Sequence, residues 1–354
     1  MDTYHKIFLE NIESIYKNKP ELCGSIEIDK MVDNLIPEMV STLKKSLAIS
    51  TREMLEEHRS LSEGFVSRNI SRWAEAFDLF ETLIVICTES GEEFNSSYRA
   101  QAVSEDDLVF DLVVRHHARA CHIANEILCL LKNGFADAAH ARWRALHEVA
   151  ATAMFIAKHG KECAERFYHH EVVDSYIGML EHKKYEHRLQ AKGPSIEVIA
   201  ECKEQFDLLI KRYGKKYADN YGWASYIFPN HKKVGFGAIE KDVNLEHMRP
   251  YYKWASQNIH TGSKAMRNRL GLCETNEDIL LVGQSNSGMT DPAHAAAISL
   301  VQITVTLLLL KPNIDHLVIS KVIQDYSAEV GDTFLRIDKN NRIDHDNIFI
   351  EIDN

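Results

Sequence analysis

The apolar residues of this chain recur at helical spacing along nearly its whole length. Near the N-terminus, Ile7, Phe8, Ile12 and Ile15 fall on one face of a predicted amphipathic helix. No segment alternates apolar and polar residues for long enough to predict a β-strand. The pattern therefore predicts an all-α protein: a multi-helix bundle built around a central antiparallel helical hairpin, with an N-terminal helical extension.

The central hairpin is predicted from two long helical segments, 104–132 and 136–158, which are joined at Asn133-Gly134. Glycine readily adopts the positive φ that ends a helix. An earlier helix, which begins near residue 71, is predicted to end at Gly91 for the same reason. Further helices are expected over 161–190, 195–212 and 245–260, from Thr290-Asp291-Pro292 onward, and over 314–335 ahead of a loose polar tail.

These elements divide the chain into three predicted parts. They are an N-terminal helical segment (1–60), a helical bundle domain with a polar pocket (61–312), and a C-terminal helix with a polar tail (313–354). The segment 213–237 is aromatic and rich in glycine, and it is the one substantial irregular stretch. We expect this segment, which contains Trp223, to form a lid or a pocket wall.

Composition and charge narrow the classes of partner. The chain has 354 residues, 45% of them hydrophobic, and a formal net charge of -11. This charge disfavours bulk binding of DNA and binding to an anionic membrane. The seven cysteines form no C-x-x-C pair and the N-terminus has no apolar signal region, so we expect reduced thiols and a cytoplasmic location. The apolar segment 293–310 contains several polar residues, which predicts a buried core helix rather than a membrane span.

Ionisable residues crowd the predicted hairpin. Over 112–148 there are five Lys or Arg residues, three acidic residues and five His. On the first helix they form one stripe, because Arg115, Arg119, His122 and Glu126 are spaced by three or four residues. On the second helix the corresponding residues are His140, Arg142, Arg144, His147 and Glu148.

Folding the two helices antiparallel about Gly134 brings the two stripes together. Glu126 is then expected opposite Arg142, Arg119 opposite Glu148, and His122 beside His147. One interpretation is a buried ladder of ion pairs that fixes the register of the helices. The other is a functional site, in which arginines hold an anion while His and Glu move protons.

The hairpin motif N-E-I-L-x-L-L-x-N-G…A-x-A-R-W-R-x-L-H-E resembles a family of uncharacterised bacterial proteins that is known only as a domain of unknown function. The resemblance extends over about 65–310, through Arg72-Trp73, Glu165-Arg166-Phe167-Tyr168, the Y-G-W-A-S at 221–225 and the W-A-S-Q-N-I-H at 254–260. The family implies which residues matter but supplies no activity.

Two further motifs resemble the R-x4–6-H motif of HEPN ribonucleases, helical bundles that dimerise to form their active site. They are Arg142-x4-His147 and Arg115-x6-His122. The resemblance implies a homodimeric effector ribonuclease, active in phage defence or stress, in which His activates the RNA 2′-OH and Arg stabilises the phosphorane. The predicted catalytic residues are Arg115, His122, Arg142, Arg144, His147 and Glu148, and the predicted binding residues are Arg119, Glu126, His260 and Trp223.

Two other functions stay open. A non-catalytic module could use Arg144 and Arg119 to clamp an anionic ligand or a partner. A metal-dependent hydrolase could assemble Glu126, Glu148 and His260 by tertiary contact, with His260 following Tyr252 and Ser256 on one helical face. The chain contains no H-E-x-x-H or Cys/His cluster, so we expect no metal and no cofactor. It also lacks the P-loop, Rossmann and nucleophile-elbow motifs.

Overall fold

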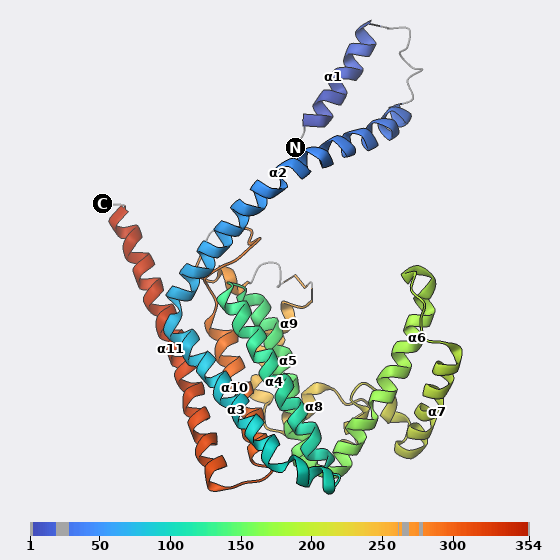
Figure 1. The fold of residues 1–354 in the computed structure, drawn as a ribbon, viewed down its shortest axis with the longest axis vertical. Coiled ribbons are helices and arrows are strands. Elements are labelled where there is room, and N and C mark those ends of the chain that lie inside the picture. The colour runs from blue at the N-terminus through green and yellow to red at the C-terminus, as the bar shows by residue number, and fades with distance from the viewer. Residues whose placement is uncertain (1–2, 19–27, 261, 264–268, 276–278, 353–354) are drawn as a thin grey trace. The chain divides into compact units, whose positions relative to one another are not determined.

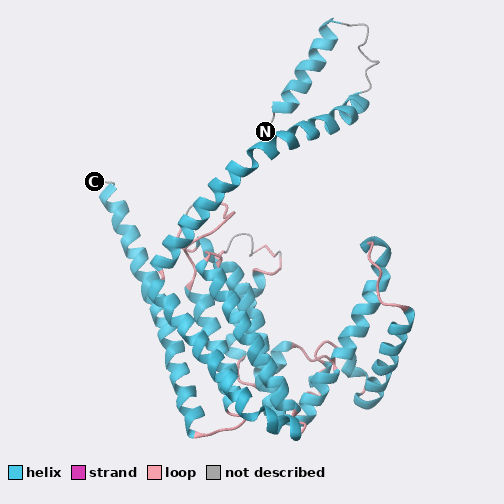
Figure 2. Cartoon of the chain, viewed as in Figure 1, coloured by secondary structure: helices cyan, strands magenta, loops and turns pink. Residues whose placement is uncertain are grey.

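The computed structural model describes residues 3–18, 28–260, 262–263, 269–275 and 279–352. Every regular element in these ranges is helical, which confirms the prediction of an all-α bundle (Figure 2). The chain forms two compact units, residues 1–64 and 65–354. The α-helices are α1 (Thr3–Asn18), α2 (Ile28–Arg72), α3 (Ala74–Ser104), α4 (Leu108–Lys132), α5 (Ala136–His169), α6 (Glu171–Leu189), α7 (Ile196–Tyr213), α8 (Phe236–Asp242), α9 (Arg249–Gln257), α10 (Thr290–Leu308) and α11 (Ile314–Ile352).

The first unit contains α1 and most of α2. Helix α2 runs through Pro37 without ending, and it carries exposed apolar side chains at three- to four-residue spacing, among them Ile36, Val40, Leu43 and Leu47. An apolar stripe at this spacing is the mark of an amphipathic helix.

The second unit is organised around the α4–α5 hairpin, which is its most extensive helix–helix contact. Helix α10 packs against α3, α4, α5 and α11, so it occupies the centre of the bundle (Figure 1). In this core the indole of Trp143 donates a hydrogen bond of 3.0 Å to the Ser299 hydroxyl. Helices α6 and α7 pack against each other (Figure 1).

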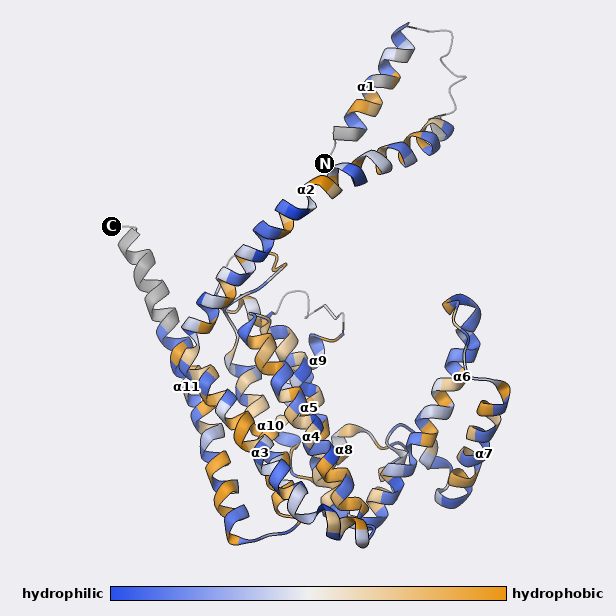
Figure 3. Ribbon diagram, in the orientation of Figure 1, coloured by the Kyte–Doolittle hydropathy of each residue, from blue (hydrophilic) through white to orange (hydrophobic). Residues whose placement is uncertain are grey.

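Helix α10 also meets the length and hydropathy of a membrane-crossing helix. It is the one helix in the described ranges that does so, and 67% of its apolar window is buried inside the bundle. Figure 3 shows its hydrophobic colouring among the other bundle helices. This burial is what the polar residues of 293–310 led us to expect of a core helix.

Several predicted helix limits are wrong. The first hairpin helix begins at Leu108 and not at residue 104, and two helices end later than predicted. Helix α3 continues through Gly91 to Ser104. The glycine does not end the helix but allows a neighbouring ring to pack closely, since a Cβ there would lie 2.3 Å from Cε1 of His117. The polar tail after residue 335 is not loose, since α11 extends to Ile352. The segment 313–354 therefore contains a single long helix, which packs on α3 and α10.

Candidate functional site

The turn of the α4–α5 hairpin is anchored by polar contacts from distant segments. Gly134 has φ +81°, as the sequence predicts for the residue that closes α4. The amide of Asn69 donates hydrogen bonds to the carbonyls of Leu131 and Lys132, each at 3.0 Å. These bonds satisfy carbonyls that the end of a helix leaves without partners. The turn is therefore fixed, and with it the register of every side chain along the hairpin.

The outer face of the hairpin carries the stripe predicted on α4. Glu126 is central to it, because its carboxylate accepts a hydrogen bond from Arg142 on α5 and lies 3.3 Å from Nε2 of His122. The expected pairing of Glu126 with Arg142 is confirmed. The His122 side chain is 73% exposed, and Arg119, one turn away, is also exposed. Among the described residues Arg119 has no ion-pair partner.

Arg115 begins the same stripe and belongs to a small ion-pair cluster. Its Nε lies 2.7 Å from Oδ2 of Asp111, whose other oxygen is 2.6 Å from Arg99. Burial raises the pKa of Asp111, but the hydrogen bonds from Arg115 and Arg99 outweigh it and hold this pKa below the ordinary value. Asp111 is therefore ionised at neutral pH and neutralises much of the charge of Arg115.

His147 lies on the opposite, inner face of α5, so its predicted place beside His122 is wrong. Its side chain is fully buried, and Nε2 lies 2.9 Å from the equally buried carboxylate of Glu240 on α8. Glu240 also pairs with Arg249, the first residue of α9. The physical reason is the rotation of the helix: residues five positions apart, such as Arg142 and His147, point to different sides of it. Because Arg142 faces Glu126 on the outer face, His147 faces inward.

Arg144 and Glu148 pair with each other along α5, so the expected pairing of Glu148 with Arg119 is wrong. Nε of Arg144 lies 3.1 Å from Oε1 of Glu148, which also accepts a hydrogen bond from the Tyr252 hydroxyl. The guanidinium of Arg144 lies 4.7 Å from the centre of the Tyr252 ring. Burial and the hydrogen bond to Glu148 raise the pKa of Tyr252, so this phenol is a neutral donor.

His140 and His260 both lie away from the outer stripe. His140 is buried between the rings of Trp143 and Trp254, and burial lowers its pKa to about 4. His260 is exposed just beyond the end of α9. Of the residues predicted to share a helical face with His260, Tyr252 reaches Glu148 on the hairpin.

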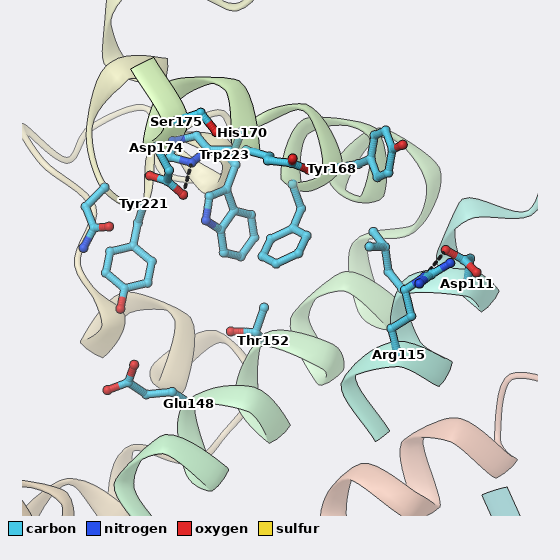
Figure 4. Close-up of a pocket in the computed structure, with 14 residues that line it drawn as sticks. Asp111, Arg115, Glu148, Thr152, Tyr168, His170, Asp174, Ser175, Tyr221 and Trp223 are labelled. Carbon is cyan, nitrogen blue, oxygen red and sulfur yellow. Dashed lines mark hydrogen bonds and ion pairs between the residues drawn. The ribbon is translucent and has the colours of Figure 1, made fainter. Parts of the chain in front are cut away.

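A cavity of about 730 Å³ opens beside the hairpin, between α4, α5, α6 and the loop that contains Trp223. Figure 4 shows Trp223 at its centre, with the Asp174–His170 pair at one end and the Asp111–Arg115 pair at the other. The segment 213–237 thus supplies a pocket wall, as predicted. Three predicted site residues line this cavity, namely Arg115, Glu148 and Trp223.

The proposed metal triad is not assembled. Within the described ranges, no group of three or more His, Cys, Asp or Glu side chains is arranged to hold a metal ion. Glu126 and Glu148 lie in separate ion pairs with Arg142 and Arg144. The alternative of a hydrolase built on Glu126, Glu148 and His260 is therefore not supported by their placement.

Three residues of these clusters were not predicted from the sequence, namely Glu240, Arg249 and Tyr221. Glu240 follows a glycine-rich stretch and carries no motif, so only its tertiary contact with His147 reveals it. Tyr221 lines the cavity, and burial raises its pKa to about 12. The family-like motif Y-G-W-A-S, which contains Tyr221, was the one signal that could have drawn attention to it.

Comparison with known proteins gives one match. Residues 110–279 match the model of a family that is described as Family of unknown function (DUF5677). This confirms, over those residues, the resemblance to an uncharacterised family. No curated protein and no solved structure matches the chain. The matched range includes α4 from residue 110 onward, all of α5 and the loop of Trp223.

Proposed function

We propose that the outer face of the α4–α5 hairpin binds RNA and cleaves it without a metal ion. The observation that supports this proposal is the position of Glu126, which holds an exposed imidazole and a guanidinium at one place. A carboxylate that orients a histidine is a recurrent arrangement for a general base. Arg142 pairs with Glu126, and the exposed Arg119 lies one turn before His122 on α4. We assign these two arginines to the phosphate.

The chemistry needs one base, one acid and a stabilised pentavalent phosphorus. With its Nε2–H directed at Glu126, His122 offers the lone pair of Nδ1 to the 2′-OH of a ribose. The 2′-oxygen forms a bond to phosphorus, its proton passes to His122, and the bond to the 5′-oxygen breaks. The products are a 2′,3′-cyclic phosphate and a 5′-hydroxyl. Arg119 and Arg142 stabilise the negative charge that develops on the phosphorane oxygens.

The leaving 5′-oxygen needs a proton. The stripe on α4 contains one histidine, His122, which already acts as the base. We infer that the chain acts as a homodimer, in which two outer faces meet and the imidazolium of one copy protonates the leaving oxygen. The net charge of -11 argues for a specific RNA rather than bulk RNA, because the rest of the surface repels a polyanion.

The test is cleavage of total cellular RNA by the purified protein in EDTA. We expect cleavage by the wild type and a loss of about 100-fold or more in His122→Ala, the usual size of a general-base contribution. The matched control is His187→Ala, which removes an exposed histidine from α6. End-group analysis should find 2′,3′-cyclic phosphates. Equal cleavage by wild type and His122→Ala would reject the proposal.

A second candidate is a module that binds a phosphate-bearing ligand without turnover. It is favoured by Arg119, which is exposed and has no ion-pair partner among the described residues. In that case wild type would retain labelled RNA on a filter but leave it intact. Arg119→Ala would lose retention, whereas Arg188→Ala on α6 would not.

A further inference from the structure

The segment 211–233, which leads from the end of α7 toward α8, is strongly basic in an acidic chain (Figure 1). It contains six Lys or Arg residues and one acidic residue, Asp219, which gives it a net charge of +5. The whole chain has a net charge of -11, so the residues outside this segment together carry -16. Positive charge concentrated in this way on an acidic protein indicates a local attraction for a polyanion.

Hydrogen bonds bring the two ends of this segment together. The ammonium of Lys216 donates to the carbonyl oxygens of Pro229 and His231, each at 2.9 Å. These bonds join the short helix Lys215–Ala218 to the turn that precedes the next pair of lysines. Four exposed lysines therefore form one surface, which we call the basic patch: Lys215, Lys216, Lys232 and Lys233.

Little of the charge of the basic patch is neutralised by the protein itself. Lys233 lies 3.8 Å from Oδ1 of Asp219, and this is the one ion pair of the patch in the described part of the chain. An exposed ion pair at such a distance is weak, so Lys233 can exchange Asp219 for another anion. Lys216 is held by uncharged carbonyl groups and keeps its full charge. The patch is therefore available to an anionic partner.

The surroundings of the basic patch favour a nucleic acid over a membrane. The exposed ring of His231 stacks on Phe228 with 5.3 Å between the ring centres, so an aromatic face lies next to the lysines. Single-stranded nucleic acids bind to positive surfaces that offer such a ring to a base. A membrane-binding surface instead places large exposed apolar side chains beside its basic residues. Between residues 209 and 250 the chain exposes no large apolar side chain.

We propose that the basic patch binds the backbone of single-stranded RNA. The four ammonium groups pair with phosphates, and a base stacks on His231. The choice of RNA as the polyanion rests on the proposed function. In that scheme the patch holds the strand, whereas His122 on α4 carries out the cleavage. Binding to the patch is therefore measurable on an RNA that cannot be cleaved.

The test is fluorescence anisotropy of a labelled single-stranded 2′-O-methyl RNA, titrated with the full chain at several salt concentrations. This RNA has no free 2′-OH, so the proposed cleavage cannot occur on it. Lys215→Gln/Lys232→Gln changes two exposed side chains, and its Kd should rise about tenfold or more. The salt dependence of log K should become shallower by roughly 1.4, since each lost phosphate contact removes about 0.7. The control Lys192→Gln/Lys253→Gln removes two exposed charges outside the patch and should bind like wild type.

Two results would overturn the proposal. If the wild type does not bind the 2′-O-methyl RNA, the patch serves a different anionic partner, such as an acidic protein. If the patch variant and the control variant bind equally, RNA responds at most to the overall charge of the chain. The outcome is separate from the test on His122: a chain that binds this RNA through the patch but cleaves no RNA would reject only the cleavage.

Discussion

Two clusters, one on the outer face of the hairpin and one against its inner face, contain the same residue types in opposite environments. On the outer face Glu126 joins His122 to Arg142, and these three side chains are 34–73% exposed. On the inner face Glu240 joins His147 to Arg249, and both His147 and Glu240 are fully buried. Each cluster is one carboxylate between an imidazole and a guanidinium. Only the outer one is open to a ligand.

The difference separates stability from reactivity. A buried carboxylate and imidazole lose their hydration, so removing one partner leaves a costly uncompensated group. An exposed cluster keeps its water, so removing a partner costs little folding energy. Under the proposed function, the same change removes the catalytic base. The two clusters are therefore expected to respond to mutation in opposite ways.

The largest expected effect is on the inner face. Glu240→Ala leaves His147 and Arg249 without their buried partner and should cost about 3–5 kcal/mol of unfolding free energy. Urea denaturation measures this loss. The control is Glu75→Ala, which breaks the exposed pair with Arg336 and should cost about 1 kcal/mol or less. Similar losses in the two variants would mean that the inner cluster is not a structural one.

A second effect is the pH dependence of stability from His140. Its pKa is about 4 in the folded protein against an ordinary value of 6.5, so the unfolded chain binds the proton first. The stabilisation is complete above pH 6.5 and is lost as the pH falls toward 4. The burial of neutral His140 should therefore lower the unfolding free energy by roughly 2 kcal/mol between pH 7 and pH 5. The unfolding free energy of His140→Phe should fall by about 2 kcal/mol less than that of wild type over this pH interval.

His117 serves as the internal reference for this measurement. Its pKa is also lowered to about 4 by burial, and it is untouched by the His140 substitution. The variant should therefore retain a fall of similar size between pH 7 and pH 5. An unchanged pH dependence in His140→Phe would show that this ring is not the buried neutral group described above.

The smallest effect on stability is expected on the outer face. His122→Ala should change the unfolding free energy by about 0.5 kcal/mol or less, because the side chain is 73% exposed. The same variant should lose RNA cleavage. His147→Ala should do the reverse, with a large loss of stability and no specific loss of cleavage per folded molecule. A variant of His122 that unfolds would remove the contrast between the two faces.

The hairpin itself was predictable from residue patterns. The positive φ at Gly134 and the Glu126–Arg142 pair both follow from helical spacing and an antiparallel turn. Gly91 shows where local signals fail, because a glycine can serve close packing against His117 as well as a helix end. Nothing adjacent in sequence distinguishes these two uses.

The sequence alone thus determined the helices, the hairpin and the set of ionisable residues on it, because these depend on local periodicity. The tertiary structure decided which of them reach solvent. His147 and His122 are equivalent as motif residues, but α8 and α9 cover the face of α5 that carries His147. The cavity likewise arises from α4, α5, α6 and a distant loop. Such contacts depend on how helices pack in space, which no single segment of sequence encodes.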